Sequence, residues 1–123
     1  MFTPTLVKRV ISRINGKAKG GPDDIPPVFF KHCSNELASP LAFLFNKCME
    51  NNYIPPVWLH AYITPIYKKS VTTDPQNYRP IALTCTTCRI METIIKDQLI
   101  DFLLLKNLIS KHQHGFMRKR STT

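Results

Sequence analysis

Two short strand-like segments, each containing a proline, constrain the fold of this chain more than any other feature. In "AYITPIYKK" (61–69), side chains alternate between two faces, as they do in a strand. Pro65 lacks an N–H, which predicts an edge strand or a bulge. In "RPIALT" (79–84), Pro80 biases Arg79 away from helix and opens a second strand. The polar stretch "KSVTTDPQNY" between them predicts an antiparallel hairpin with a long loop.

Apolar residues recur with a helical period on both sides of this hairpin. The pattern predicts helices over 4–14, 27–33, 36–51 and 87–104. Thr3 is the expected N-cap of the first helix, and Pro4 suits its first position. The side chains expected to face a core are Leu6, Val7, Val10, Ile11, Ile14, Leu37, Leu41, Leu44, Phe45, Cys48, Ile90, Met91, Ile94, Ile95, Gln98, Leu99, Phe102 and Leu103.

The start of the third helix has two solutions in the sequence. Pro40 falls near the expected start at 36, and Ser39 could instead cap a helix that begins there. The stretch "NGKAKGGPDDIPP" is dense in glycine and proline and must be a loop, although it lacks the Gly-Lys-Ser/Thr ending of a P-loop. The expected fold is therefore α+β, with helices flanking a small antiparallel hairpin.

The charge balance favours an anionic partner. Seventeen Lys and Arg residues oppose eight Asp and Glu residues, for a formal net charge of +9. Nucleic acid is the commonest partner for such a surface, and an ordinary basic protein is the alternative. With 43% apolar residues, the 123-residue chain can form a core, which argues against wholesale disorder.

Neither a secretory signal nor a membrane span is expected. The N-terminal stretch lacks a long apolar run before a small-residue cleavage site, and "LIDFLLLKNLI" is short and carries two charges. Without a secretory signal, the four cysteines are interpreted as reduced thiols.

The hairpin brings a first group of candidate binding residues together. Lys68, Lys69 and Arg79 should meet at its neck, because paired strands lie about 5 Å apart. Convergent cations repel one another unless an anion lies between them, and a triphosphate or a nucleic-acid backbone would meet that need. The alternative is a solvated hairpin tip with scattered lysines.

Two other motifs carry weaker signals. In "HGFMRKRST", Arg118, Lys119 and Arg120 neighbour Phe116, a mixture that suits contacts to a nucleic-acid strand or, alternatively, an exposed basic tail. Cys85 and Cys88 form C-x-x-C, but the downstream His112 and His114 do not have zinc-finger spacing, so the pair is interpreted as buried packing residues. The adjacent acids Asp23 and Asp24, and Asp97 and Asp101 one helical turn apart, carry no mark of a catalytic metal clamp.

The blocks "KAKGGPDDIPP", "AYITPIYKK", "PQNYRPIALT" and "QHGFMRKRST" resemble, in sequence and order, the fingers and upper palm of reverse transcriptases from non-LTR (LINE-type, jockey-like) retrotransposons. The resemblance covers essentially the whole chain, so residues 1–123 are expected to form a partial reverse-transcriptase domain. It implies an RNA-directed DNA polymerase of right-hand architecture, acting on an RNA template, a DNA primer and nucleoside triphosphates.

The resemblance also assigns roles to individual residues. Arg79, with Lys68 or Lys69, matches the family's contacts to the triphosphate of the incoming nucleotide. Lys17 and Lys19 become candidate contacts to the template backbone, and Cys85 and Cys88 lie in the helix that supports the fingers. The positions implied near primer and template are Gln113, Gly115, Phe116, Arg120 and Ser121.

One departure from the family bears on catalysis. The resemblance implies two Mg²⁺ ions held by palm aspartates that follow the "RST" block, whereas this chain ends at Thr123. The expectation is therefore a catalytically incomplete segment that lacks its palm partner. The alternatives are a non-enzymatic basic module that binds RNA or DNA, and a relic without function. A nuclear site of action is implied by the family alone.

Overall fold

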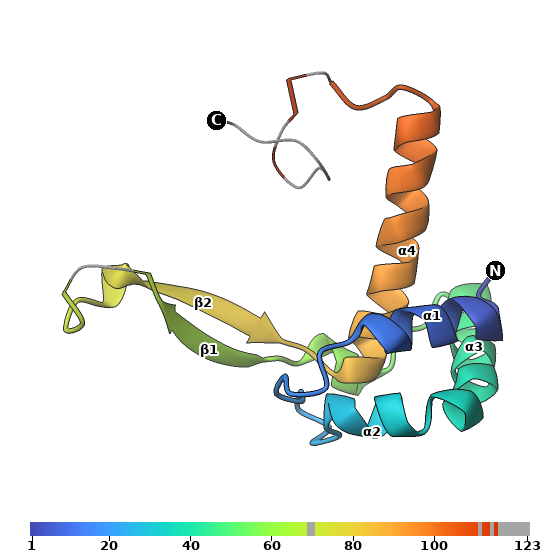
Figure 1. Ribbon diagram of the computed structural model, residues 1–123, viewed down its shortest axis with the longest axis horizontal. Helices are drawn as coiled ribbons and strands as arrows, with labels where there is room; N and C mark the ends of the chain where they lie inside the picture. Colours follow the sequence, from blue (N-terminus) through green and yellow to red (C-terminus); the bar gives the residue numbers. More distant parts are fainter. Residues whose placement is uncertain (69–70, 111, 114, 116–123) are drawn as a thin grey trace.

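The computed structural model describes residues 1–68, 71–110, 112, 113 and 115. Its α-helices are α1 (Pro4–Arg13), α2 (Pro27–His32), α3 (Ser34–Glu50) and α4 (Thr86–Leu105). Its strands are β1 (Tyr62–Tyr67) and β2 (Tyr78–Leu83), and short 3-10 helices lie at Pro56–Leu59 and Pro75–Asn77. The predicted α+β class is confirmed. The hairpin projects away from the helices, however, and does not lie between them (Figure 1).

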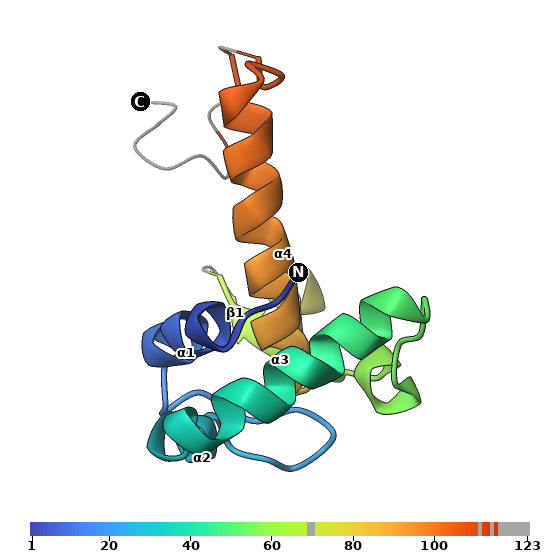
Figure 2. The same cartoon turned by 90° about the vertical axis from the view of Figure 1, so that its right-hand side faces the viewer.

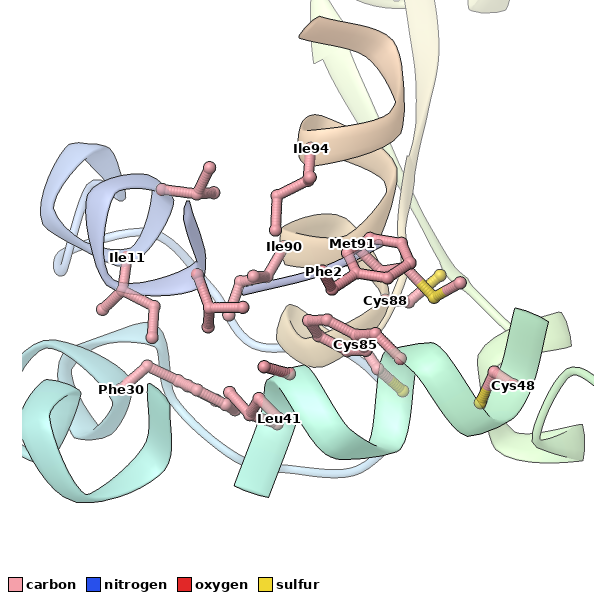
Figure 3. Packing of buried hydrophobic residues seen from close by; sticks show 14 of the residues in the cluster. Phe2, Ile11, Phe30, Leu41, Cys48, Cys85, Cys88, Ile90, Met91 and Ile94 are labelled. Carbon is pink, nitrogen blue, oxygen red and sulfur yellow. The ribbon is translucent and has the colours of Figure 1, made fainter. Parts of the chain in front are cut away.

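The helical layer closes around one apolar core. Its helices α1, α2 and α3 pack with the first turns of α4, whose remaining turns extend outward (Figure 2). Phe45 is fully buried at the centre of this core and makes edge-to-face contacts with Phe2 and Trp58, at ring-centroid distances of 5.4 and 6.1 Å. Residues from all four helices meet in Figure 3, including Ile11, Phe30, Leu41 and Ile90.

The N-terminus is held to this layer by hydrogen bonds as well as by packing. The Asn46 side chain accepts from the Phe2 backbone N–H and donates to the Phe2 carbonyl, each at 2.8 Å. The predicted cap of α1 is also confirmed, because the Thr3 side chain accepts from the Leu6 N–H and Pro4 occupies the first helical position. The start of the chain is therefore fixed by one local contact, at Thr3, and by one distant partner, Asn46.

The third helix starts earlier than either of the two positions that the sequence suggested. It begins at Ser34 and runs unbroken through Pro40, so Ser39 is not its cap. A proline inside a helix removes one hydrogen bond and costs about 3 kcal/mol. The buried face of α3 offsets this cost, and it includes Ala38 and Ala42, whereas the expected core residue Leu44 is 38% exposed.

The apolar stripe of α4 divides into two halves. Ile90, Met91 and Ile94 are buried as predicted. Further along, Ile95, Leu99 and Phe102 are 39%, 53% and 51% exposed, so placing them in this core was wrong. Gln98 is exposed as well, and Leu103 is only half-buried. The reason is geometric, because the outer turns of α4 extend beyond the helical layer (Figure 1).

The hairpin register explains why it tolerates two prolines. Pro65 lies directly opposite Pro80. The Lys68 N–H donates to the Asn77 carbonyl at 2.8 Å, which makes that pair a hydrogen-bonded one. Pairs alternate in an antiparallel ladder, so the proline pair occupies a non-hydrogen-bonded position where neither residue needs a donor. The edge-strand prediction for Pro65 is thus confirmed, and the register contains no bulge.

No helix in the described part of the chain is long and apolar enough to cross a membrane.

Candidate nucleic-acid interface

One face of the hairpin carries the two described cations of the predicted neck. Arg79 pairs with Ile66 across the ladder, and Lys68 follows two residues after Ile66. Because strand side chains alternate, Lys68 and Arg79 project from the same face as diagonal neighbours, about 7–8 Å apart. Both are exposed. Two long cationic side chains at this spacing can reach a common phosphate. The third predicted cation, Lys69, lies outside the described residues.

The hairpin loop organises itself through its own polar side chains. The Lys68 ammonium donates to the Gln76 carbonyl at 3.3 Å, and the Asp74 carboxylate accepts from the Gln76 N–H at 2.9 Å. Asn77 and Tyr78 donate from their side chains to the carbonyls of Val71 and Thr72, at 2.8 and 2.9 Å. These contacts hold the Lys68 end of the hairpin. Within the described residues, the Arg79 guanidinium has no hydrogen-bonding or ion-pair partner and is free for a ligand.

The other face of the hairpin is apolar and aromatic. Tyr67 and Tyr78 pair across the ladder with ring centroids 5.5 Å apart. Next to them a shallow depression of about 440 Å³ is lined by Pro65, Thr72, Thr73, Pro75, Tyr78 and Pro80. The hairpin therefore carries Lys68 and Arg79 on one face, beside Ile66, and the paired tyrosines and both prolines on the other.

The second predicted cationic site lies on the loop between α1 and α2. Lys17 and Lys19 are both exposed there. The Asn15 side chain accepts from the Lys17 N–H at 3.0 Å, which starts the loop with a local turn. The loop passes close to the root of the hairpin, since a Cβ added to Gly21 would lie 2.4 Å from the Thr84 carbonyl oxygen. The loop therefore adjoins the root of the hairpin, whereas Lys68 and Arg79 lie toward the other end of the two strands.

The C-terminal candidates are only partly described. Gln113 donates from its side chain to the Gly115 carbonyl at 2.9 Å, which forms a small local turn. His112 is exposed. The remaining candidates of this block lie outside the described residues, namely His114, Phe116, Arg118, Lys119, Arg120 and Ser121.

The two cysteines of the C-x-x-C motif are packing residues, as predicted. Cys85 and Cys88 belong to the core and are free thiols. Burial raises the pKa of Cys88 to about 11, and the neighbouring Glu92 carboxylate adds to this rise. Burial is also the main cause that raises the pKa of Cys85, with Asp23 contributing. A raised pKa keeps a thiol protonated, and the protonated form is a poor nucleophile.

The carboxylates do not fit the two-Mg²⁺ site that the family resemblance implies. Asp97 forms a salt bridge with Arg13 at 3.3 Å, and the Asp23 carboxylate accepts a hydrogen bond from the Ile25 N–H at 3.3 Å. All eight acids fall within the described residues, where no three Asp, Glu, His or Cys side chains gather as metal ligands. The two acidic pairs seen in the sequence therefore remain separate surface features.

Arg89 is a functional candidate that the sequence analysis missed. It is half-buried in the first turns of α4 and donates to the Lys19 carbonyl at 3.2 Å and to the Thr86 hydroxyl at 3.1 Å. No periodic or motif signal marks a contact between residues 70 positions apart. A charged residue on the buried side of a helix start was the one available hint.

Similarity to known proteins agrees with the resemblance described above. The chain is 30% identical over 117 residues to the RNA-directed DNA polymerase from mobile element jockey of Drosophila melanogaster, a match that covers 94% of this chain and 13% of that protein. It is 26% identical over 123 residues to the probable RNA-directed DNA polymerase from transposon BS of the same organism, covering 97% and 14%.

A third relative comes from another insect. The Retrovirus-related Pol polyprotein from type-1 retrotransposable element R1 of Bradysia coprophila is 25% identical over 114 residues, covering 91% of this chain and 11% of the polyprotein. No family model matches the chain. The chain spans about one eighth of the length of the curated relatives that it matches. It is therefore related, along nearly its whole length, to the RNA-directed DNA polymerases of non-LTR retrotransposons.

Proposed function

We propose that residues 1–123 form the fingers and the start of the palm of an RNA-directed DNA polymerase. In this proposal, the cationic face of the hairpin binds the triphosphate of the incoming nucleotide through Arg79 and Lys68, with Lys69 as the alternative to Lys68. The observation that carries it is the placement of Arg79 and Lys68 on one face of a hairpin stiffened by Pro65 and Pro80. A planar guanidinium beside an ammonium suits phosphate oxygens.

The template would follow the loop between α1 and α2. Lys17 and Lys19 are exposed there and would contact the RNA backbone. Gln113 and Gly115, with Phe116, Arg120 and Ser121, would lie toward primer and template. The exposed apolar side chains on the second half of α4, Ile95, Leu99 and Phe102, support a segment that packs within a larger protein, because a contiguous exposed apolar patch usually marks an interaction surface.

Catalysis would need carboxylates beyond those in these 123 residues. The eight acids here are dispersed or paired with cations, so we propose that Mg²⁺ for polymerisation is held elsewhere in a complete enzyme. Purified residues 1–123 should not extend a DNA primer on an RNA template with Mg²⁺. Extension that requires this chain, in preparations free of other polymerases, would overturn this part of the proposal.

The triphosphate site can be tested on the chain itself. Arg79→Ala should weaken binding of a fluorescent deoxynucleoside triphosphate by at least about tenfold, since charge-assisted hydrogen bonds contribute about 1.5–3 kcal/mol. Arg9→Ala is the matched control, because Arg9 is an exposed arginine on α1, away from the hairpin. The melting temperature should be unchanged in both variants. Equal losses in the two variants would show that only net charge matters.

A basic RNA- or DNA-binding module is the second candidate, favoured by the dispersed carboxylates and the net charge of +9. The two candidates predict different competition results. If the hairpin binds nucleotide and the loop binds RNA, saturating triphosphate should leave most of the RNA affinity intact, and Arg79→Ala should weaken triphosphate binding. A module without a nucleotide site should show no saturable triphosphate binding. Under both candidate functions the RNA affinity of the chain should fall with added salt, so salt dependence alone does not distinguish them.

A further inference from the structure

Arg89 joins the lysine-bearing loop to the start of α4. Its Nη2 donates to the Lys19 carbonyl at 3.2 Å and to the Thr86 hydroxyl at 3.1 Å. Its Nε is buried, with no hydrogen-bond partner in the described part of the chain. A guanidinium in such a place is held in one orientation, and a hydrogen bond from a charged donor is stronger than a neutral one. These hydrogen bonds thus direct the Arg89 guanidinium toward one backbone carbonyl and one hydroxyl of the protein itself.

Two further contacts hold the same loop against the same segment. A Cβ on Gly21 would lie 2.4 Å from the Thr84 oxygen and 2.5 Å from the Cys85 nitrogen, so only glycine allows this approach. Asp23 is close enough to Cys85 to raise its thiol pKa, after the larger effect of burial. The loop is therefore attached at three successive points, residues 19, 21 and 23.

The segment that receives the loop is also the root of the hairpin. Strand β2 ends at Leu83, directly before Thr84, and α4 begins at Thr86. On the far side of Arg89, the Thr93 hydroxyl donates to the Arg89 carbonyl at 2.6 Å, which ties the residue to the next helical turn. The loop and hairpin therefore share one rigid support.

We infer that Arg89 is a positioning residue that holds the loop against the root of the hairpin, so that Lys17 and Lys19 contact one RNA strand together. It acts through the Lys19 carbonyl and leaves the lysine side chains free for phosphate. The inference rests on the proposed function only in naming RNA as the ligand. The attachment of the loop is a separate claim with its own measurement.

The test measures binding of a fluorescein-labelled single-stranded RNA by anisotropy at several salt concentrations. Lys17→Ala/Lys19→Ala should lower the salt slope by about 1.4, because each lost phosphate contact on a single strand removes about 0.7. Arg89→Gln should lower it nearly as much, and adding Arg89→Gln to the double variant should change it little further. Arg9→Gln, which removes the same charge from the exposed face of α1, should lower the slope less than Arg89→Gln does.

A second readout follows the loop without RNA. Trypsin should cut after Lys17 and Lys19 several times faster in Arg89→Gln than in Arg9→Gln, with unchanged helix content by circular dichroism. If Arg89→Gln fails to fold, Arg89→Lys, which keeps the charge but replaces the planar guanidinium by an ammonium, should show intermediate cleavage and an intermediate slope.

The outcomes separate the two claims. Wild-type protein without salt-dependent RNA binding would overturn the proposed function, and the trypsin comparison would still decide whether Arg89 holds the loop. Equal slopes for Arg89→Gln and Arg9→Gln, in protein that binds RNA through its loop lysines, would overturn the positioning role alone. Equal cleavage rates would overturn the attachment itself.

Discussion

The helical layer and the hairpin hold their shapes by different means. In the helical layer, Phe45 and Ile11 are fully buried, and the helices are held together by packing. In the hairpin, every residue of both strands is at least partly exposed, and the backbone ladder with its loop contacts holds the shape. The layer is thus stabilised by burial, whereas the hairpin is stabilised by hydrogen bonds and by prolines that restrict its backbone.

This difference teaches where substitutions should affect stability and where they should affect binding. Removing atoms from the layer leaves a cavity, and the cost appears in the free energy of unfolding. Removing an exposed hairpin side chain leaves no cavity, so its main consequence falls on ligands. The placement of Arg79 and Lys68 on the hairpin therefore keeps binding chemistry apart from folding stability.

The largest expected effect tests the layer at its centre. Phe45→Ala should lower the free energy of unfolding by about 3–5 kcal/mol in chemical denaturation. Phe43, on the same helix, is 66% exposed, and Phe43→Ala should cost less than about 1 kcal/mol. Similar costs for the two variants would mean that the buried and exposed faces of α3 have been assigned wrongly.

The next effect tests the junction between the two regions. Gly21→Ala should cost about 1–3 kcal/mol, because the new Cβ would meet backbone atoms of residues 84 and 85 that cannot move aside. Gly16→Ala is the matched control, since the nearest atom to its Cβ would be Cδ of the flexible Lys31 side chain at 3.3 Å, with Val28 at ordinary contact distances of 3.7 and 3.8 Å. Thermal melting of both variants measures the difference, which vanishes if the loop does not dock on the hairpin root.

A third measurement uses pH to show that buried thiols belong to the layer. A cysteine thiol in the unfolded chain has a pKa of about 8.5, whereas burial raises the pKa of Cys88 in the folded chain to about 11. The folded state keeps the Cys88 proton to higher pH than the unfolded chain does. The stabilisation that results is therefore complete below about pH 8 and is lost as the pH rises toward 11. Denaturation from pH 7 to 10.5 should show a steeper alkaline loss for wild type than for Cys88→Ala. Parallel curves would contradict the assignment.

The smallest effect lies in the hairpin. Tyr78→Phe removes the exposed hydrogen bond to the Thr72 carbonyl and should cost less than about 1 kcal/mol. Amide hydrogen exchange should accelerate in residues 71–78 and stay unchanged in α1 and α3. Uniform acceleration across the chain would show that the hairpin and the layer unfold together, against the contrast drawn above.

Much of the local structure follows from the sequence alone. The helix over Pro4–Arg13 with its Thr3 cap, the loop rich in glycine and proline, and the hairpin with its two prolines all result from short-range rules. The placement of Lys68 on the same face of the hairpin as Arg79 also follows from strand alternation once the register is known. These features depend on neighbours within a few residues, which is why pattern and spacing predict them.

Tertiary structure decided the rest. Helix α3 passes through Pro40 because its buried face offsets the lost hydrogen bond, and Leu44 is exposed where Ala42 faces the core. The outer turns of α4 extend beyond the layer, so half of its apolar stripe stays uncovered within this chain's described structure. Arg89 reaches the Lys19 carbonyl across 70 residues. Each outcome depends on which distant surface lies opposite a residue, and periodicity in one segment carries no information about that partner.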